Sequence, residues 1–213
     1  MQHDLVIQQP AAAPAVPRHT AELLLLFHGV GASARDLQPL AEALAESQSD
    51  AWVVSLQAPH PSEFGQGWQW FSVQGVTEAN RPGRVAAALP AFLQKVAAWQ
   101  ARAGSTPERT TLIGFSQGAI MSLEATQESD TPVAGRVIGI AGRFAQAPQR
   151  APQGTAVHLL HGDQDQVMPV QLAVSAHRQL QALGATVSLQ RFSGLGHGID
   201  QRVLNAALAL LAA

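Results

Sequence analysis

The segment of residues 110–125 (TTLIGFSQGAIMSLEA) constrains the fold more than any other part of the chain. An apolar run meets the pentapeptide GFSQG at residues 114–118, and a segment with the composition of a helix follows. A serine with a glycine two residues away on each side, between a strand and a helix, is the pattern of a nucleophile elbow. Side chains at the glycine positions would collide in so tight a turn. The segment therefore predicts a strand–turn–helix unit that presents the Ser116 hydroxyl above a sheet edge.

Apolar runs alternate with amphipathic segments along the rest of the chain. Continuous runs predict buried strands at residues 22–27, 51–56, 110–115, 136–141 and 156–160, and two further strands are expected at 5–8, on an edge, and 186–192. Helices are expected at residues 36–46, 85–102, 117–127, 170–183 and 199–211. Strands that alternate with helices predict an α/β fold with a mostly parallel, doubly wound sheet flanked by helices.

Length and composition favour a single globular domain over residues 1–213, in which residues 1–20 supply an edge strand and a Pro-rich loop. The chain has 213 residues, of which 46% are hydrophobic and 13% charged. A net charge of −2 offers no basic patch, which argues against nucleic acid and anionic membranes as partners. No apolar run is long enough to insert into a membrane, and no signal peptide is evident, so a cytoplasmic location is expected.

The chain contains no cysteine, which excludes disulfides, a thiol nucleophile and cysteine-ligated metal. A serine hydroxyl is a weak nucleophile until a neighbouring base takes its proton, so Ser116 needs an imidazole and an acid to orient it. After a nucleophile elbow the acid comes first along the chain and the histidine second. His197, which lies between two glycines after the last strand, is the expected base. Asp165 is preferred to Asp163 as the acid, because it lies further along its loop and Asp163 suits a turn or cap.

The other seven histidines are less suitable bases. Those in the N-terminal segment precede the sheet, His177 lies inside a predicted helix, and His60 precedes the serine. His158 and His161 point to opposite faces of a strand, so they cannot bind one metal ion. His28 and His161 each precede a glycine at a strand end, which suits a structural hydrogen bond. No metal site is expected.

Four segments occur in an order that is found in a known family. They are residues 26–31 (LFHGVG), GFSQG, residues 161–169 (HGDQDQVMP) and Gly196-His197. Together they resemble the phospholipase/carboxylesterase family of α/β-hydrolases, which includes acyl-protein thioesterases, lysophospholipases and small bacterial carboxylesterases. The resemblance extends over about residues 22–211, and GFSQG and the HGDxDxxxP segment are its specific parts. It implies an α/β-hydrolase fold without a large cap domain.

The resemblance also implies roles for individual residues. Ser116 would be the nucleophile, Asp165 the orienting acid and His197 the base. The backbone N–H groups of Val30 and Gln117 would form the oxyanion hole.

An acyl site is expected from residues 57–84 together with residues 142–144. Trp70 and Phe71 occupy the place of a Trp–Phe pair that walls the acyl site in the family, and Phe144 is a further candidate for substrate binding. Gly198-Ile199-Asp200 replaces the small polar residues that follow the histidine in typical acyl-protein thioesterases, which favours the small bacterial carboxylesterases. The implied activity is hydrolysis of small-molecule carboxylic esters, with thioesters and lysophospholipids open. No cofactor is expected, and a homodimer is an open expectation.

Two other functions compete with hydrolysis. Residues 29–34 (GVGASA) fit the dinucleotide-binding fingerprint G-x-G-x-x-A, but the next strand ends at Leu56 with no acid to hold the ribose. A catalytically silent hydrolase fold used for binding is the second competitor. The complete set of serine, acid and histidine argues against it, because drift would be expected to remove at least one of them.

Overall fold

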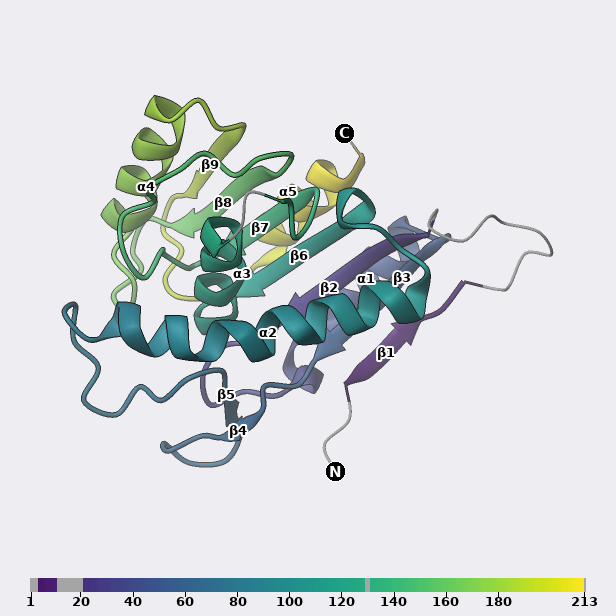
Figure 1. Cartoon of the computed structure of the whole chain (residues 1–213), viewed down its shortest axis with the longest axis horizontal. Helices are drawn as coiled ribbons and strands as arrows, with labels where there is room; N and C mark the ends of the chain where they lie inside the picture. Colours follow the sequence, from purple (N-terminus) through teal and green to yellow (C-terminus); the bar gives the residue numbers. More distant parts are fainter. Residues whose placement is uncertain (1–3, 11–20, 129–130, 213) are drawn as a thin grey trace.

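A seven-stranded sheet forms the centre of the computed structural model, which describes residues 4–10, 21–128 and 131–212. Its strand order is β1-β3-β2-β6-β7-β8-β9, with β1 antiparallel to β3 and the other pairs parallel (Figure 1). The strands are β1 (Leu5–Gln8), β2 (Glu22–Phe27), β3 (Ala51–Leu56), β6 (Thr110–Phe115), β7 (Arg136–Ile140), β8 (Ala156–Gly162) and β9 (Val187–Phe192). A separate pair joins β4 (His60–Pro61) to β5 (Trp68–Gln69).

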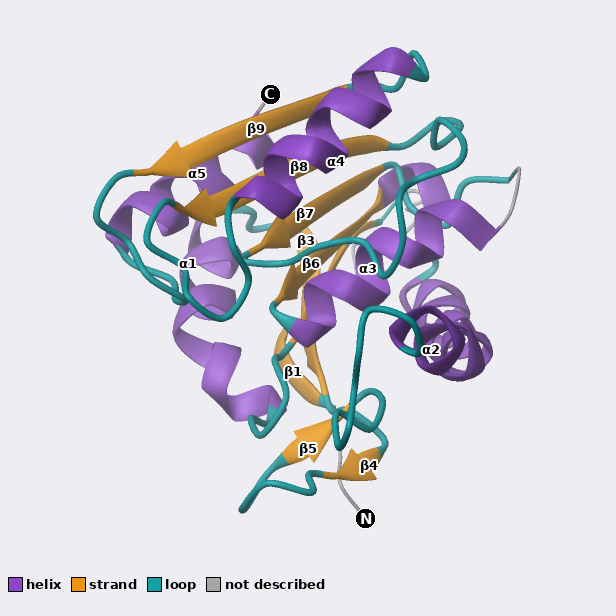
Figure 2. Cartoon of the chain, turned by 90° about the vertical axis from the view of Figure 1, so that its left-hand side faces the viewer, coloured by secondary structure: helices purple, strands orange, loops and turns teal. Residues whose placement is uncertain are grey.

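Helices cover both faces of the sheet (Figure 2). One face packs against α2 (Arg81–Ala103), α3 (Gln117–Glu128) and α4 (Gln171–Ala182), and the other against α1 (Gln38–Ser47) and α5 (Gln201–Ala212). Short 3-10 turns, η1 (Ala34–Leu37) and η2 (Pro107–Arg109), precede α1 and β6. The predicted α/β fold with a mostly parallel, doubly wound sheet is confirmed. Most of the expected Pro-rich loop lies outside the described residues.

Strand β2 shows why its sequence is a continuous apolar run. Leu23, Leu25 and Phe27 pack on the side of α2, α3 and α4. Leu24 and Leu26 pack on the side of α1 and α5. Because helices cover both faces, neither set of alternate side chains meets water, and all five are at most 3% exposed.

Helix α2 differs from its prediction. It begins at Arg81, before the expected residue 85, and Pro90 lies in its interior instead of near its first turns. Proline removes one hydrogen bond of the helix and disfavours this position. Leu89 and Phe92, on either side of it, are buried against the sheet and hold the helix across the proline. The other predicted elements are present, with ends that differ by a few residues.

The turn between β6 and α3 is as tight as its two glycines predict. A Cβ atom on Gly118 would lie 2.1 Å from the carbonyl oxygen of Phe27, and one on Gly114 would lie 2.5 Å from the Cα of Ala119. Ser116 between them has φ of 53°, in the left-handed region that side chains disfavour. The turn therefore requires glycine on both sides and stores strain at the serine.

The strand order places this turn where an α/β sheet binds ligands. From β2 the chain continues to the neighbouring strand β3, and it then crosses over β2 to reach β6 on the other side. The loops after β2 and β6 therefore leave the carboxyl edge of the sheet in opposite directions and open a crevice between them. Val30 follows β2 and Ser116 follows β6, so both lie at this crevice.

The close approach at Gly118 predicts a large loss of stability on substitution. Gly118→Ala should lower the free energy of unfolding by about 3 kcal/mol, because the clash is with backbone atoms of β2 that cannot move aside. The measurement is urea unfolding followed by circular dichroism. Gly83→Ala is the control, since a Cβ there meets nothing within 4 Å and alanine favours the helix. Equal stability of the two variants would contradict this account of the turn.

Candidate active site

Three side chains from separate loops meet at the carboxyl edge of the sheet. Ser116 lies between β6 and α3, Asp165 in the loop after β8, and His197 in the loop between β9 and α5. The Ser116 hydroxyl lies 2.9 Å from Nε2 of His197, and Nδ1 of His197 lies 2.7 Å from Oδ2 of Asp165. The three residues named from the sequence thus form one continuous hydrogen-bonded chain.

Asp165 is held as a carboxylate by its surroundings. Its side chain is completely buried, and its Oδ1 accepts hydrogen bonds from the amides of Val167 (2.9 Å) and Met168 (2.8 Å). Burial raises the pKa of Asp165, but hydrogen bonds from the Met168 amide, the His197 ring and the Val167 amide outweigh it and leave the pKa below its ordinary value. A charged acid can therefore orient His197 without exposure to water.

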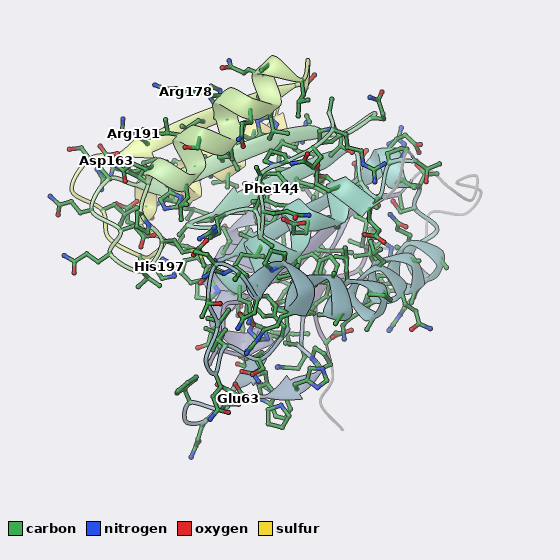
Figure 3. All side chains as sticks on the ribbon, turned by 60° about the vertical axis from the view of Figure 1, so that its left-hand side comes forward. Glu63, Phe144, Asp163, Arg178, Arg191 and His197 are labelled. Atoms are coloured by element: carbon green, nitrogen blue, oxygen red, sulfur yellow. The ribbon has the colours of Figure 1, made fainter. Side chains whose placement is uncertain are left out.

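The alternative acid, Asp163, takes no part in the hydrogen bonds that link Ser116, His197 and Asp165. Its carboxylate pairs with the Arg191 guanidinium at 2.7 Å, and both side chains are partly exposed next to β9 (Figure 3). The turn that the sequence suggested for Asp163 is present, and the residue also forms a surface ion pair between the β8 loop and β9.

His161 also belongs to this site, although the sequence analysis did not place it there. Its Nε2–H donates to the Met168 carbonyl at 2.7 Å and lies 3.3 Å from Oδ2 of Asp165, with the side chain 1% exposed. The structural hydrogen bond expected at this strand end is present, and it anchors the loop that carries Asp165. No local sequence pattern signals this contact with Asp165, because His161 lies at the end of a strand and Asp165 lies in the loop that follows.

His28 holds the loop after β2 in place. Its Nδ1–H donates to the carbonyl of Gly29 at 2.7 Å, and its Nε2 accepts from the amide of Ala58 at 3.1 Å. Burial lowers the pKa of His28, which favours the neutral ring that this pattern needs. The structural role expected for His28 is confirmed, and it positions the neighbouring Val30.

The backbone amides of Val30 and Gln117 lie on either side of the crevice. Within the described part of the chain, neither N–H donates a hydrogen bond to a protein acceptor. Gln117 is the first residue of α3, so its N–H also carries the partial positive charge of a helix start. Both groups are therefore available to a developing negative charge.

The side chain of Gln117 has a further role that the sequence did not reveal. Its Oε1 accepts from the amide of Trp70, and its Nε2 donates to the carbonyl of Phe71, both at 2.7 Å. Gln117 is 2% exposed, so these bonds are shielded from water. They attach residues 70 and 71 directly to the turn that carries Ser116.

A pocket of about 530 Å³ opens beside Ser116. Its apolar wall includes Phe71, Val73, Val76, Ile120, Met168 and Leu172. Its lining also contains three charged side chains, Glu78, Arg81 and Arg143. A site of this size and polarity suits a small organic group.

Of the three aromatic residues expected at the substrate site, only Phe71 lines this pocket. Trp70 is 3% exposed and packs against Phe27 and Phe92, each with ring centroids 5.5 Å away. Phe144 is buried and borders a smaller hollow beside α4, well apart from His197 (Figure 3). The expectation for Trp70 and Phe144 is corrected: both side chains belong to the hydrophobic core on the α2, α3 and α4 side of the sheet and do not line this pocket.

The segment that fits a dinucleotide fingerprint has its amides engaged within the protein. The N–H of Gly31 donates to the Trp68 carbonyl at 2.9 Å, and that of Ala34 donates to Oε1 of Gln57 at 3.1 Å. A pyrophosphate would need such groups free. Among the described residues, no group of three or more His, Asp or Glu side chains is arranged to hold a metal ion. Nor does any described helix have the length and hydropathy to cross a membrane.

Comparison with known proteins agrees with this fold. The family model described as Phospholipase/Carboxylesterase matches residues 9–213. Esterase YpfH of Escherichia coli (strain K12) is 42% identical over 98% of this chain and 87% of its own length. Acyl-protein thioesterase 1 of Gibberella zeae is 25% identical over 95% of this chain and 94% of its own. The crystal structure of esterase PE8 has a TM-score of 0.81 and 31% identity, and covers 94% of this chain and 95% of that one.

The fold and the named relatives define an α/β-hydrolase. The chain belongs to the phospholipase/carboxylesterase family, a family of carboxylic ester hydrolases. The resemblance stated from four short segments is thereby confirmed.

The environment of Asp165 predicts a pH-dependent contribution to stability. Because its pKa is lower in the folded protein than in the unfolded chain, its stabilisation is complete above the unfolded value of about 3.9 and is lost as the pH falls through the folded value. Asp165→Asn should lower the free energy of unfolding by about 2 kcal/mol at pH 7. The difference from the parent protein should shrink near pH 3, as measured by urea unfolding.

Asp163→Asn is the matched control for this measurement. It removes the same charge from an exposed ion pair with Arg191 and should change stability by less than about 1 kcal/mol. A deficit of Asp165→Asn that is the same at pH 3 and pH 7 would contradict the role given to the buried carboxylate.

Proposed function

We propose that this protein is a serine esterase that hydrolyses small carboxylic esters through an acyl-enzyme on Ser116. The observation that carries the proposal is the chain of hydrogen bonds from Ser116 through His197 to Asp165, which opens onto an apolar pocket. A serine, an imidazole and a buried acid in this order are the parts that nucleophilic acyl transfer requires.

In the first half of the reaction, Nε2 of His197 takes the proton of the Ser116 hydroxyl as Oγ attacks the ester carbonyl carbon. The carbonyl oxygen becomes an oxyanion, which the amides of Val30 and Gln117 stabilise. Removing one donor of this kind typically raises the barrier by about 3 kcal/mol. The C–O bond to the alcohol then breaks, and the alcohol leaves with the proton held by His197.

In the second half, water replaces the alcohol. His197 takes a proton from the water as its oxygen attacks the acyl carbon, and the carboxylic acid leaves as the proton returns to Ser116. Throughout, Oδ2 of Asp165 accepts from Nδ1–H of His197, so that Nε2 directs its lone pair toward the serine whenever it holds no proton. The cycle uses only this chain's groups, the ester and water.

The pocket and the relatives support a small ester as the substrate. Apolar side chains line most of the pocket next to Ser116, which suits a short acyl group. Val167 at its edge is 67% exposed, so the site is open to solvent and to a range of leaving groups. A relative named as an esterase is 42% identical, whereas one named as an acyl-protein thioesterase is 25% identical, which favours esters over thioesters.

A substrate panel tests this proposal. It consists of p-nitrophenyl esters of graded chain length, an acyl thioester and a lysophospholipid, each assayed on the parent protein and on Ser116→Ala. Short-chain esters should be hydrolysed fastest, and Ser116→Ala should lose at least about three orders of magnitude in kcat.

Ser122→Ala is the matched control for the loss of the hydroxyl. Ser122 is also buried in α3, but its hydroxyl donates to the Gly118 carbonyl within the helix and lies outside the pocket lining. This variant should keep ester hydrolysis. Hydrolysis by Ser116→Ala at the rate of the parent protein would refute the assignment of the nucleophile.

A further inference from the structure

The pocket beside Ser116 contains a charged cluster that ester hydrolysis does not require. Arg143 makes a two-point contact with Glu78, with Nη1 at 3.0 Å from Oε1 and Nη2 at 2.8 Å from Oε2. Nη1 of Arg81 lies 2.6 Å from the same Oε1. All three side chains line the pocket that Ser116 lines.

The cluster has one more cation than anion. Among the described residues, no other charged side chain lines the pocket, so the formal charge of its lining is +1. The side chains of Arg81 and Arg143 are 15% and 14% exposed, whereas that of Glu78 is 70% exposed. The two guanidinium groups are thus built into the wall, and their carboxylate partner approaches them from the solvent side.

Arg143 is fixed in position next to the nucleophile. It follows Gly142, where an added Cβ would lie 3.5 Å from the carbonyl oxygen of Ser116. Its Nε–H donates to the Phe144 carbonyl at 2.9 Å, which leaves both terminal nitrogens to face Glu78. The nearby acid Glu124 is buried, accepts hydrogen bonds from the amides of Ala145 and Gln146, and lies outside the pocket lining.

We propose that Arg81 and Arg143 form a subsite for a carboxylate carried by the ester substrate, and that Glu78 occupies this subsite until the substrate displaces it. The inference rests on the proposed function and specifies its substrate class: half-esters of short dicarboxylic acids, or acyl esters of small hydroxy acids. Two guanidinium groups present donors in the planar geometry that a carboxylate matches.

The state of Glu78 supports this reading. Hydrogen bonds from Arg143 and Arg81 lower the pKa of Glu78 to about 2, so the pair stabilises a carboxylate strongly at this place. A carboxylate of the substrate would meet the same donors. Because Glu78 stays charged at neutral pH and is largely exposed, it competes for the subsite and can move out into water.

The test measures a ratio on each variant, so that loss of folded protein cancels. The ratio is kcat/KM for a carboxylate-bearing ester divided by kcat/KM for its amide analogue. The first pair is the half methyl ester of glutaric acid, with the charge on the acyl side, and the same methyl ester with its free carboxylate replaced by a carboxamide. The second pair is acetylated glycolic acid, with the charge on the alcohol side, and the same acetyl ester with its free carboxylate replaced by a carboxamide.

The proposal predicts a ratio above one in at least one pair, which identifies the side that carries the charge. In that pair, Arg143→Gln and Arg81→Gln should each lower the ratio by about tenfold, because a hydrogen-bonded charge partner is lost. Glu78→Gln should raise it severalfold, because the competitor loses its charge. Arg109→Gln is the control: its ion pair with Glu22 lies at the start of β2 and β6, away from the pocket, so its ratio should equal that of the parent protein.

Ratios that are the same in the parent protein, Arg143→Gln and Arg81→Gln would overturn the inference, since a purely structural cluster would affect both esters alike. A ratio below one in both pairs that Glu78→Gln does not raise would overturn it too. A separate result would refute the proposed function itself: hydrolysis of the neutral esters by Ser116→Ala as fast as by the parent protein.

Discussion

The close contact between the turn after β6 and the end of β2 is the constraint on which the rest of the site depends. Because Gly118 lies against the Phe27 carbonyl, α3 begins directly beside the loop after β2. This contact sets Ser116 in its strained backbone conformation and brings the free amides of Gln117 and Val30 to one crevice. The side chain of Gln117 then attaches residues 70 and 71 to the same turn. One packing contact therefore positions the proposed nucleophile, both proposed oxyanion donors and a wall of the pocket.

The ionisable groups around this turn have separate structural roles. Asp165 is buried yet anionic because two amides and His197 bind it, and His161 holds the loop that supplies those amides. His28, buried and with a lowered pKa, serves as a neutral brace. The charged side chains of the pocket lining are Glu78 and its two arginines, which is where we infer substrate selection.

Much of the fold and the core of the site could be predicted from the sequence, because both follow from local sequence patterns. Buried runs such as residues 22–27 and the GFSQG turn specify strands and a nucleophile without knowledge of distant contacts. The side-chain roles of Gln117 and His161 could not be predicted, since each depends on a partner that the fold supplies. Trp70 and Phe144 were misplaced because composition does not say which of two adjacent residues faces a cavity. The cluster of Glu78, Arg81 and Arg143 joins segments about 65 residues apart (Glu78 to Arg143) and has no local signature. The cytoplasmic location and a homodimer stay predictions.

Labelling with a fluorophosphonate probe, followed by peptide mass spectrometry, tests the central claim most directly. Such a probe reacts with a serine hydroxyl only where a base activates it and donors stabilise the charged product. The account predicts about one equivalent of label per chain, on Ser116, and its loss in both Ser116→Ala and His197→Ala. Label on another serine, or undiminished labelling of the His197 variant, would contradict the proposed activation of Ser116 by His197.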